Sequence, residues 1–251
     1  MRDEHSLKIN AVCGCIRREV LRYLHDPIQT IFNEIFSALL MLFAFYFLRP
    51  GQQDILIIGI IVYINFGVIF SNMKMTIFVG KMDNSIYYQI SSAVPRTTLY
   101  LIYVATSIFR ALLISFSLLA IVCFFVKPYN TYALGPLCFW LVVTDVAFAN
   151  FAVLLTLFIK SWNGFGAIDS YIVMPLLFLS GCFFGGITLP FKMEQIIHCN
   201  PIFHFFNCGV YFCTNKIIYT PSISLLICTL LLCISTVLCL HVFKNGYGIL
   251  K

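Results

Sequence analysis

The stretch from Pro175 to Asn207, PLLFLSGCFFGGITLPFKMEQIIHCNPIFHFFN, decides how this chain folds. It begins as an apolar helix that is interrupted by glycine and then by proline, at Gly181, Gly185, Gly186, Pro190 and Pro201. The apolar pieces between these breaks are too short to cross hydrocarbon. Irregular backbone at membrane depth needs protein or water to satisfy its N–H and C=O groups. The pattern favours a crossing helix followed by re-entrant half-helices that line a cavity, with a plain surface hairpin as the alternative.

The composition of the whole chain is that of an integral membrane protein. Of its 251 residues, 61% are hydrophobic and only 10% are charged, and the mean hydropathy is +0.94. These values lie outside the usual range of soluble domains. At about 20 residues per crossing, the apolar runs predict an all-α fold with six transmembrane helices. The expected spans are residues 28–48, 55–72, 98–126, 133–159, 168–186 and 222–243.

The basic residues predict the orientation of the chain in the membrane. The net charge is +6, but the lysines and arginines flank the spans, so they indicate topology rather than nucleic-acid binding. With the N-terminus inside, eleven of them fall on the inner side and four on the outer side. Both termini are therefore expected in the cytoplasm, with the broken stretch at the external face. No cleavable signal peptide is visible in the first 26 residues.

Two amphipathic segments are expected outside the spans. In residues 1–26, apolar side chains recur at helical spacing among arginines, which is typical of an interfacial helix lying along the cytoplasmic leaflet. In residues 79–94, Met82, Ile86 and Ile90 recur at the same spacing, and Pro95 closes the stretch. This second helix is either a linker on the membrane surface or a docking helix for a groove on a cytoplasmic partner.

Three charged residues fall inside the expected spans. Glu34 lies about two turns inside the first span, where it either binds a cation or solute, or snorkels toward the interface or a partner helix. Arg110 and Asp145 lie near the middle of the third and fourth spans. An isolated charge there costs about 3 to over 10 kcal/mol, depending on the method. We therefore expect that Arg110 and Asp145 pair or that each lines a polar interface, and a proton relay is the alternative.

The sequence offers little that points to an enzyme. Most of the eleven cysteines fall in or near apolar runs, where a thiol behaves as a small hydrophobe. On the outer side Cys199, Cys208 and Cys213 are candidates for a disulfide, whereas the spacing of His198, Cys199, His204 and Cys208 matches no standard zinc pattern. No phosphate-binding loop, dinucleotide fingerprint, zinc-protease motif or nucleophile elbow occurs. We expect no metal and no bound cofactor.

Three regions carry a family resemblance. The first is the stretch from Pro175 to Asn207, with Leu189-Pro190 and Asn200-Pro201. The second is Arg18 to Tyr23 ahead of the first span, and the third is the basic, glycine-containing tail Lys244 to Lys251. Together they resemble bacterial ABC-2 type transporter permeases over nearly the whole chain.

This resemblance implies a function and a set of partners. Family members pair with separate ATP-binding subunits, which bind ATP and magnesium, and many export drugs, polysaccharides or lipid-linked molecules. The resemblance implies a second permease copy, most simply as a homodimer, in the inner membrane. It makes residues 1–26 the connecting helix and residues 79–94 the coupling helix on the ATPase. The coupling residues would be Met82, Ile86, Tyr87, Ile90 and Pro95.

The resemblance also implies where the stretch from Pro175 to Asn207 lies in the protein. Residues 188–210 would form a re-entrant pair at the external mouth, between the fifth and sixth spans. The expected mouth residues are Gly181, Gly185, Gly186, Pro190, Asn200 and Pro201. Two other classes stay open. An ion-coupled secondary transporter would use Glu34, Arg110 and Asp145, and an intramembrane lipid-modifying enzyme would need acids or histidines that converge at one leaflet.

Overall fold

A computed structural model describes residues 2–25, 31–48, 53–91, 94–125, 134–183 and 190–246, and in these residues helices are joined by short turns, without a strand. The α-helices are α1 (Arg2–Leu24), α2 (Asn33–Leu48), α3 (Gln53–Lys74), α4 (Gly80–Met82), α5 (Ser85–Ile90), α6 (Arg96–Phe125), α7 (Leu134–Leu157), α8 (Trp162–Ile168), α9 (Met174–Phe178), α10 (Phe191–His198), α11 (Pro201–Thr214) and α12 (Pro221–Asn245). Two π-helical segments, η2 (Met75–Val79) and η4 (Asp169–Val173), continue α3 and α8. The all-α prediction is confirmed.

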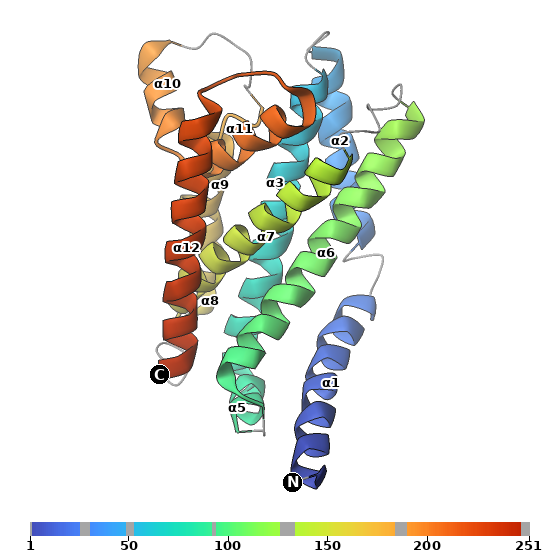
Figure 1. Ribbon diagram of the computed structural model, residues 1–251, viewed down its shortest axis with the longest axis vertical. Coiled ribbons are helices and arrows are strands. Elements are labelled where there is room, and N and C mark those ends of the chain that lie inside the picture. Colours follow the sequence, from blue (N-terminus) through green and yellow to red (C-terminus); the bar gives the residue numbers. More distant parts are fainter. Residues whose placement is uncertain are drawn as a thin grey trace.

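Helix α3 is the centre of the bundle. It is apolar on every side, which is the pattern of a helix surrounded by other helices, and it packs against α2, α6, α7 and α11 (Figure 1). In its most apolar window 78% of residues are buried, compared with 17% for α12. Helix α12 is therefore at the edge of the bundle, and its exposed leucines and isoleucines face outward.

Four helical stretches in the described residues are long and apolar enough to cross a bilayer: Gln53–Met82, Arg96–Val122, Gly135–Leu157 and Pro221–Asn245. They match the second, third, fourth and sixth expected spans. The first expected span contains a shorter apolar helix, Asn33–Phe45. The fifth is the continuous helix of α8, η4 and α9, which ends at Phe178, well before residue 186. The number of six spans stays a prediction.

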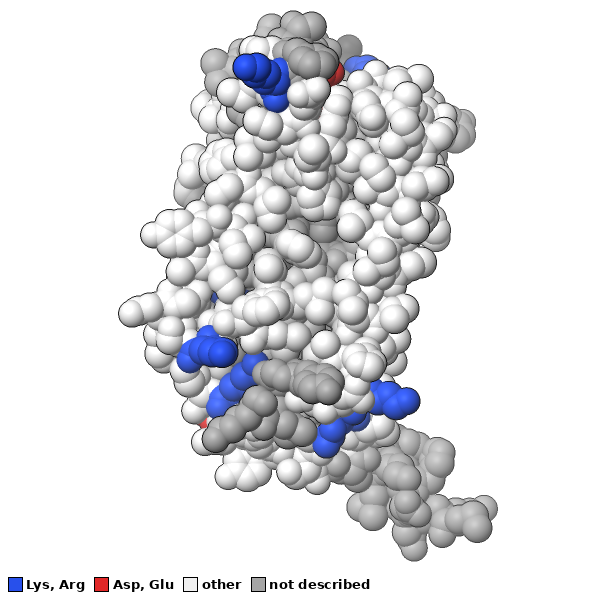
Figure 2. Space-filling view, turned by 90° about the vertical axis from the view of Figure 1, so that its left-hand side faces the viewer, with Lys and Arg blue, Asp and Glu red and all other residues white. Residues whose placement is uncertain are grey.

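The two ends of the bundle differ. Helix α1, helix α5 and the last turn of α12 share one end, the terminal end, and α10 and α11 lie at the opposite, distal end (Figure 1). On the face drawn in Figure 2, the visible lysines and arginines gather toward these two ends, and the broad middle is almost entirely uncharged. An uncharged belt between two charged ends is what a bilayer requires.

Helix α1 covers most of residues 1–26, where the sequence predicts an interfacial helix. It runs mainly along the long axis of the molecule (Figure 1), whereas the sequence predicts a helix lying flat along a leaflet. The reason is a set of polar contacts near its C-terminus. Arg18 donates a hydrogen bond of 3.0 Å to the Ser85 hydroxyl, and Arg22 donates to Thr76 and bonds Glu19 at 2.8 Å. These contacts fix α1 against α5 and η2.

Candidate functional site

The expected docking helix 79–94 is not one helix. Asn84 has φ 61° in the left-handed region, which separates α4 from α5. The Asp83 side chain closes this turn by accepting a hydrogen bond of 3.0 Å from the Ser85 backbone N–H. The backbone N–H and the side chain of Ser85 hold the pKa of the Asp83 carboxyl below its usual value. The periodicity found the right face, but asparagine and aspartate provide a turn that periodicity does not detect.

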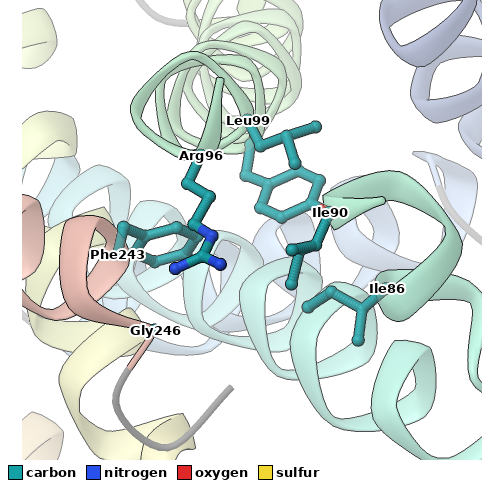
Figure 3. A pocket seen from close by; sticks show the side chains of 7 residues that line it. Ile86, Ile90, Arg96, Leu99, Phe243 and Gly246 are labelled. Atoms are coloured by element: carbon teal, nitrogen blue, oxygen red, sulfur yellow. The ribbon is translucent and has the colours of Figure 1, made fainter. Parts of the chain in front are cut away.

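The apolar side of α5 faces the interior of the protein (Figure 3). Ile86 is only 1% exposed. With Ile90 it borders a small pocket that Leu99, Tyr103 and Phe243 also line, and the Tyr103 hydroxyl donates a hydrogen bond to the Gln89 side chain. Ile86 and Ile90 therefore join α5 to α6 and α12, and a direct contact of Ile86 with a partner is contradicted by its burial.

The other side of α5 is open, as are the end of α4, the turn between α4 and α5, and the residue ahead of α6. Tyr88 is 77% and Met82 45% exposed, and Asp83, Asn84 and Pro95 are exposed as well. Tyr87 is half-buried between the two faces. Met82 and Tyr88 form an exposed apolar and aromatic surface, here called the docking surface, of a kind that suits contact with another protein.

Lys74 and Asp169 form an ion pair that the sequence analysis missed. Lys74 lies at the end of α3, where its side chain is 5% exposed, and Asp169 is the first residue of η4. The Lys74 ammonium also donates to the Phe165 carbonyl at 3.3 Å and lies 3.9 Å from the Phe165 ring centroid. From the sequence, Lys74 is counted among the basic residues in loops that flank the spans, because the uncharged run ends just before it.

Arg110 and Asp145 do not pair, so this part of the prediction is wrong. The Asp145 carboxylate accepts a hydrogen bond of 2.9 Å from Asn65, and Ser115 donates to the Asn65 carbonyl oxygen. The second carboxylate oxygen of Asp145 is buried without a partner in the described residues. The Arg110 guanidinium instead lies 4.8 Å from the Tyr23 ring. The alternative that each residue lines a polar interface agrees with these contacts.

Glu34 belongs with Arg110 rather than with Asp145. It lies in the first turn of α2, close enough to Arg110 and Tyr23 for electrostatic interaction. The three charged residues that an ion-coupled transporter would use therefore fall in two separate places. The sequence analysis did not single out Asn65 or Ser115. The signal that could have found their contacts is the occurrence of asparagine, serine and threonine within apolar runs.

At the distal end the chain turns sharply after α9. Gly181 has φ +76°, a conformation that favours glycine, and the turn packs onto α3 at Gly59. A Cβ added at Gly59 would lie under 3.0 Å from the Cys182 carbonyl oxygen. Helix α9 ends at Phe178, ahead of Gly181, where the sequence predicts a break, and Gly185 and Gly186 lie outside the described residues.

The structure also gives a physical cause for the break predicted at Pro201. Asn200 caps α11, accepting a hydrogen bond of 2.9 Å from the Ile202 N–H, and it donates one of 2.6 Å to the Leu176 carbonyl. Pro201 occupies the first turn of α11, where proline is tolerated. Pro190 precedes the first residue of α10. Asn200 therefore joins α9, α10 and α11.

Helix α11 lies across the distal end, packed between α3, α7 and α12 (Figure 1). Its buried side carries a polar cluster. The His204 ring contacts the Ser224 hydroxyl at 3.1 Å and the His198 carbonyl at 2.9 Å, and Asn207 donates to Ser224 and Tyr219. These partners occupy both ring nitrogens of His204, which gives the histidine a structural role here.

Comparison with known proteins identifies the family. A model of the ABC-2 type transporter family matches residues 10–212. The chain belongs to the ABC-2 type transporter family. It is 24% identical over 194 residues to the inner membrane transport permease YadH of Escherichia coli K12, which covers 74% of this chain and 75% of YadH. The match to YadH of Shigella flexneri has the same extent. The family match makes this chain a multi-pass transport permease, of a kind that works with ATP-binding subunits.

Proposed function

We propose that this ABC-2 permease is the membrane subunit of an exporter in the inner membrane. Two copies would form the translocation pathway, and two separate ATP-binding subunits would drive it. Both termini would lie in the cytoplasm, so that the terminal end, with α5, faces the ATP-binding subunits. Both ATP and magnesium would be bound by those subunits, and this chain would need no catalytic residue of its own.

One observation carries this proposal: α5 has an exposed outer face and an inner face built into the bundle. Tyr88 and Met82 are exposed, while Ile86 packs against α6 and α12 on the other side. A partner that pushes on Tyr88 would therefore move α6 and α12 through Ile86, Ile90 and the hydrogen bond between Tyr103 and Gln89. Closure of the ATP-binding subunits would rock the two permease copies and open a route between them.

The proposal also assigns the remaining segments. Helix α2 and the helix from α8 to α9 would be the first and fifth crossings, which makes six. Helices α10 and α11 would form the re-entrant pair at the external mouth, because they are too short to cross and are joined at Asn200. Helix α11, buried against three crossing helices, would close the outer end of the pathway.

The rival proposal is an ion-coupled secondary transporter. It would require Glu34, Arg110 and Asp145 to act together. Asp145 contacts Asn65, whereas Arg110 contacts Tyr23, so no observation favours this second function.

Co-purification tests the proposal. The affinity-tagged permease is co-expressed with an ATP-binding subunit and isolated in detergent. Replacing Tyr88 by glutamate should reduce the recovered ATP-binding subunit at least tenfold, since it places a charge in an apolar contact. Phe158→Glu is the matched control, because Phe158 is 76% exposed but lies outside the docking surface, and its recovery should be unchanged. Equal recovery with Tyr88→Glu would contradict docking through α5.

A further inference from the structure

Lys74 connects the end of α3 to the α8–α9 helix, the continuous helix of α8, η4 and α9 over residues 162–178. Its side chain is buried, and its ammonium pairs with the Asp169 carboxylate of η4 and donates a hydrogen bond of 3.3 Å to the Phe165 carbonyl of α8. The ammonium also lies 3.9 Å from the centroid of the Phe165 ring, within the range of a cation–π interaction. One buried lysine therefore contacts two successive turns of the α8–α9 helix.

A second contact joins the same two segments. Phe78 of η2 lies one turn beyond Lys74 and is buried. Its ring meets the Trp162 ring edge-on, with 5.1 Å between the ring centroids, and the Phe165 ring at the same distance. Aromatic pairs at this separation attract each other beyond the effect of burial. Lys74 and Phe78 form a junction, here called the η2 junction, that fastens η2 to α8 and η4.

The same part of the chain leads to the docking surface. Residues Gln53–Met82 form one continuous helical stretch, which contains α3, η2 and α4. Helix α5 packs against the end of this stretch, because a Cβ added at Gly80 would lie 3.5 Å from the Cβ of Ile86. A force on the docking surface therefore reaches the η2 junction through helix and packed side chains.

The α8–α9 helix packs on the bundle with one side and leaves the other side uncovered. Leu177 is buried, whereas Tyr171 is 80% exposed and Met174 is exposed as well. Near its distal end, the Leu176 carbonyl accepts the hydrogen bond of 2.6 Å from Asn200. The helix is thus fastened at the η2 junction near one end and at Asn200 near the other. A helix held in this way can tilt when one of its attachments moves.

We propose that the ion pair between Lys74 and Asp169 passes the ATP-driven movement of the docking surface on to the α8–α9 helix. Lys74 is a positioning residue, because it holds η4 to the end of α3, so that movement of α5 tilts the α8–α9 helix about its attachment at Asn200. This inference rests on the proposed function, which supplies the movement of α5. It adds the α8–α9 helix to α6 and α12, the helices that the contacts of Ile86 reach.

Hydrogen–deuterium exchange tests this inference, because it follows separate segments of the permease within its complex with the ATP-binding subunit. Exchange at residues 85–90 reports the movement of α5, and exchange at residues 162–178 reports the response of the α8–α9 helix. Each segment is measured by mass spectrometry without nucleotide and with magnesium and a non-hydrolysable ATP analogue. In the native complex we expect a nucleotide-dependent change in both segments.

The Lys74→Met variant separates this coupling from stability. Methionine occupies nearly the same space as the lysine stem and leaves no unpaired buried ammonium, and the partly exposed Asp169 carboxylate can be hydrated. We expect Lys74→Met to keep the nucleotide-dependent change at residues 85–90 and to lose the change at residues 162–178. Asp169→Asn should have the same effect and serves if Lys74→Met fails to fold, whereas Asp169→Glu retains the carboxylate and should keep both changes.

Asp54→Asn is the matched control, because it removes an ion pair at the distal end and should keep both changes. The inference is overturned if the change at residues 162–178 persists in a well-folded Lys74→Met or Asp169→Asn complex, or if only residues 85–90 respond in the native complex. A native complex without a nucleotide response at residues 85–90 would contradict the proposed function itself, and this inference with it.

Discussion

Lys74 and Asp169 join the end of α3 to the beginning of η4 through an ion pair in which the lysine is buried and the aspartate side chain is 40% exposed. Both residues adjoin π-helical segments, because η2 starts directly after Lys74 and η4 starts at Asp169. Such segments are less regular than α-helix and are frequent at functional sites. The ion pair therefore fixes two irregular backbone segments relative to each other, and the first of them, η2, leads into α4 and α5.

Removing the Asp169 charge should destabilise the protein. Asp169→Asn leaves the buried Lys74 ammonium beside Phe165 without its counter-ion, at a cost of about 1 to 2 kcal/mol, because solvent screens the partly exposed Asp169 carboxylate. The exposed pair between Lys216 and Asp54 is the matched control, and Asp54→Asn should cost less than about 1 kcal/mol. Thermal unfolding in detergent measures both variants. Equal losses would show that the buried pair has no special weight.

Gly59→Ala should disturb the distal turn. The new methyl group would collide with the Cys182 carbonyl, so we expect a loss of about 1 to 3 kcal/mol and faster maleimide labelling of Cys182, which is buried in the native protein. Gly67→Ala on the same helix meets nothing within 4 Å and should be neutral or slightly stabilising. Unchanged labelling of Cys182 in Gly59→Ala would contradict the close packing of the turn on α3.

The Asp145→Asn variant distinguishes an ABC permease from an ion-coupled secondary transporter. The asparagine carbonyl can still accept the hydrogen bond from Asn65, so a permease that needs no charge at this position should keep its stability and its transport rate. Asp145→Ala should cost about 1 to 3 kcal/mol, because it leaves the buried Asn65 amide unpaired. Loss of transport by a well-folded Asp145→Asn protein would favour ion coupling through this carboxylate.

Two substitutions of Asn200 should lower the unfolding midpoint by different amounts. Asn200→Asp keeps an oxygen that caps α11 but loses the donor to the Leu176 carbonyl, whereas Asn200→Ala loses both contacts. We expect the lowest unfolding midpoint for Asn200→Ala, with about 1 to 2 kcal/mol from the cap alone. Three equal midpoints would mean that Asn200 does not hold α9, α10 and α11 together.

The sequence predicted well what depends on local pattern. Apolar runs located the long helices, the spacing of apolar residues located α1, and Asn200-Pro201 located the start of α11. Each of these signals acts within one or two turns of helix, through burial, capping or the missing N–H of proline.

What the sequence could not predict depends on distant partners. Arg110 and Asp145 looked complementary by charge and depth, but α7 turns Asp145 toward Asn65 while Arg110 faces α1. Ile86 was correctly placed on an apolar face, yet periodicity does not say whether that face meets a partner or the same chain. Lys74 lies at the end of an uncharged run, and only its contact with Asp169 distinguishes it from a charge in a loop.

The most direct test of the central claim is site-specific photocrosslinking in cells that also express the ATP-binding subunit. A photoreactive amino acid replaces Tyr88 at the docking surface or Met193 on α10, both of which are exposed. We predict crosslinks to the ATP-binding subunit from position 88 and none from position 193. Crosslinks from position 193, or their absence at position 88 in a complex that still co-purifies, would contradict a permease that docks through α5.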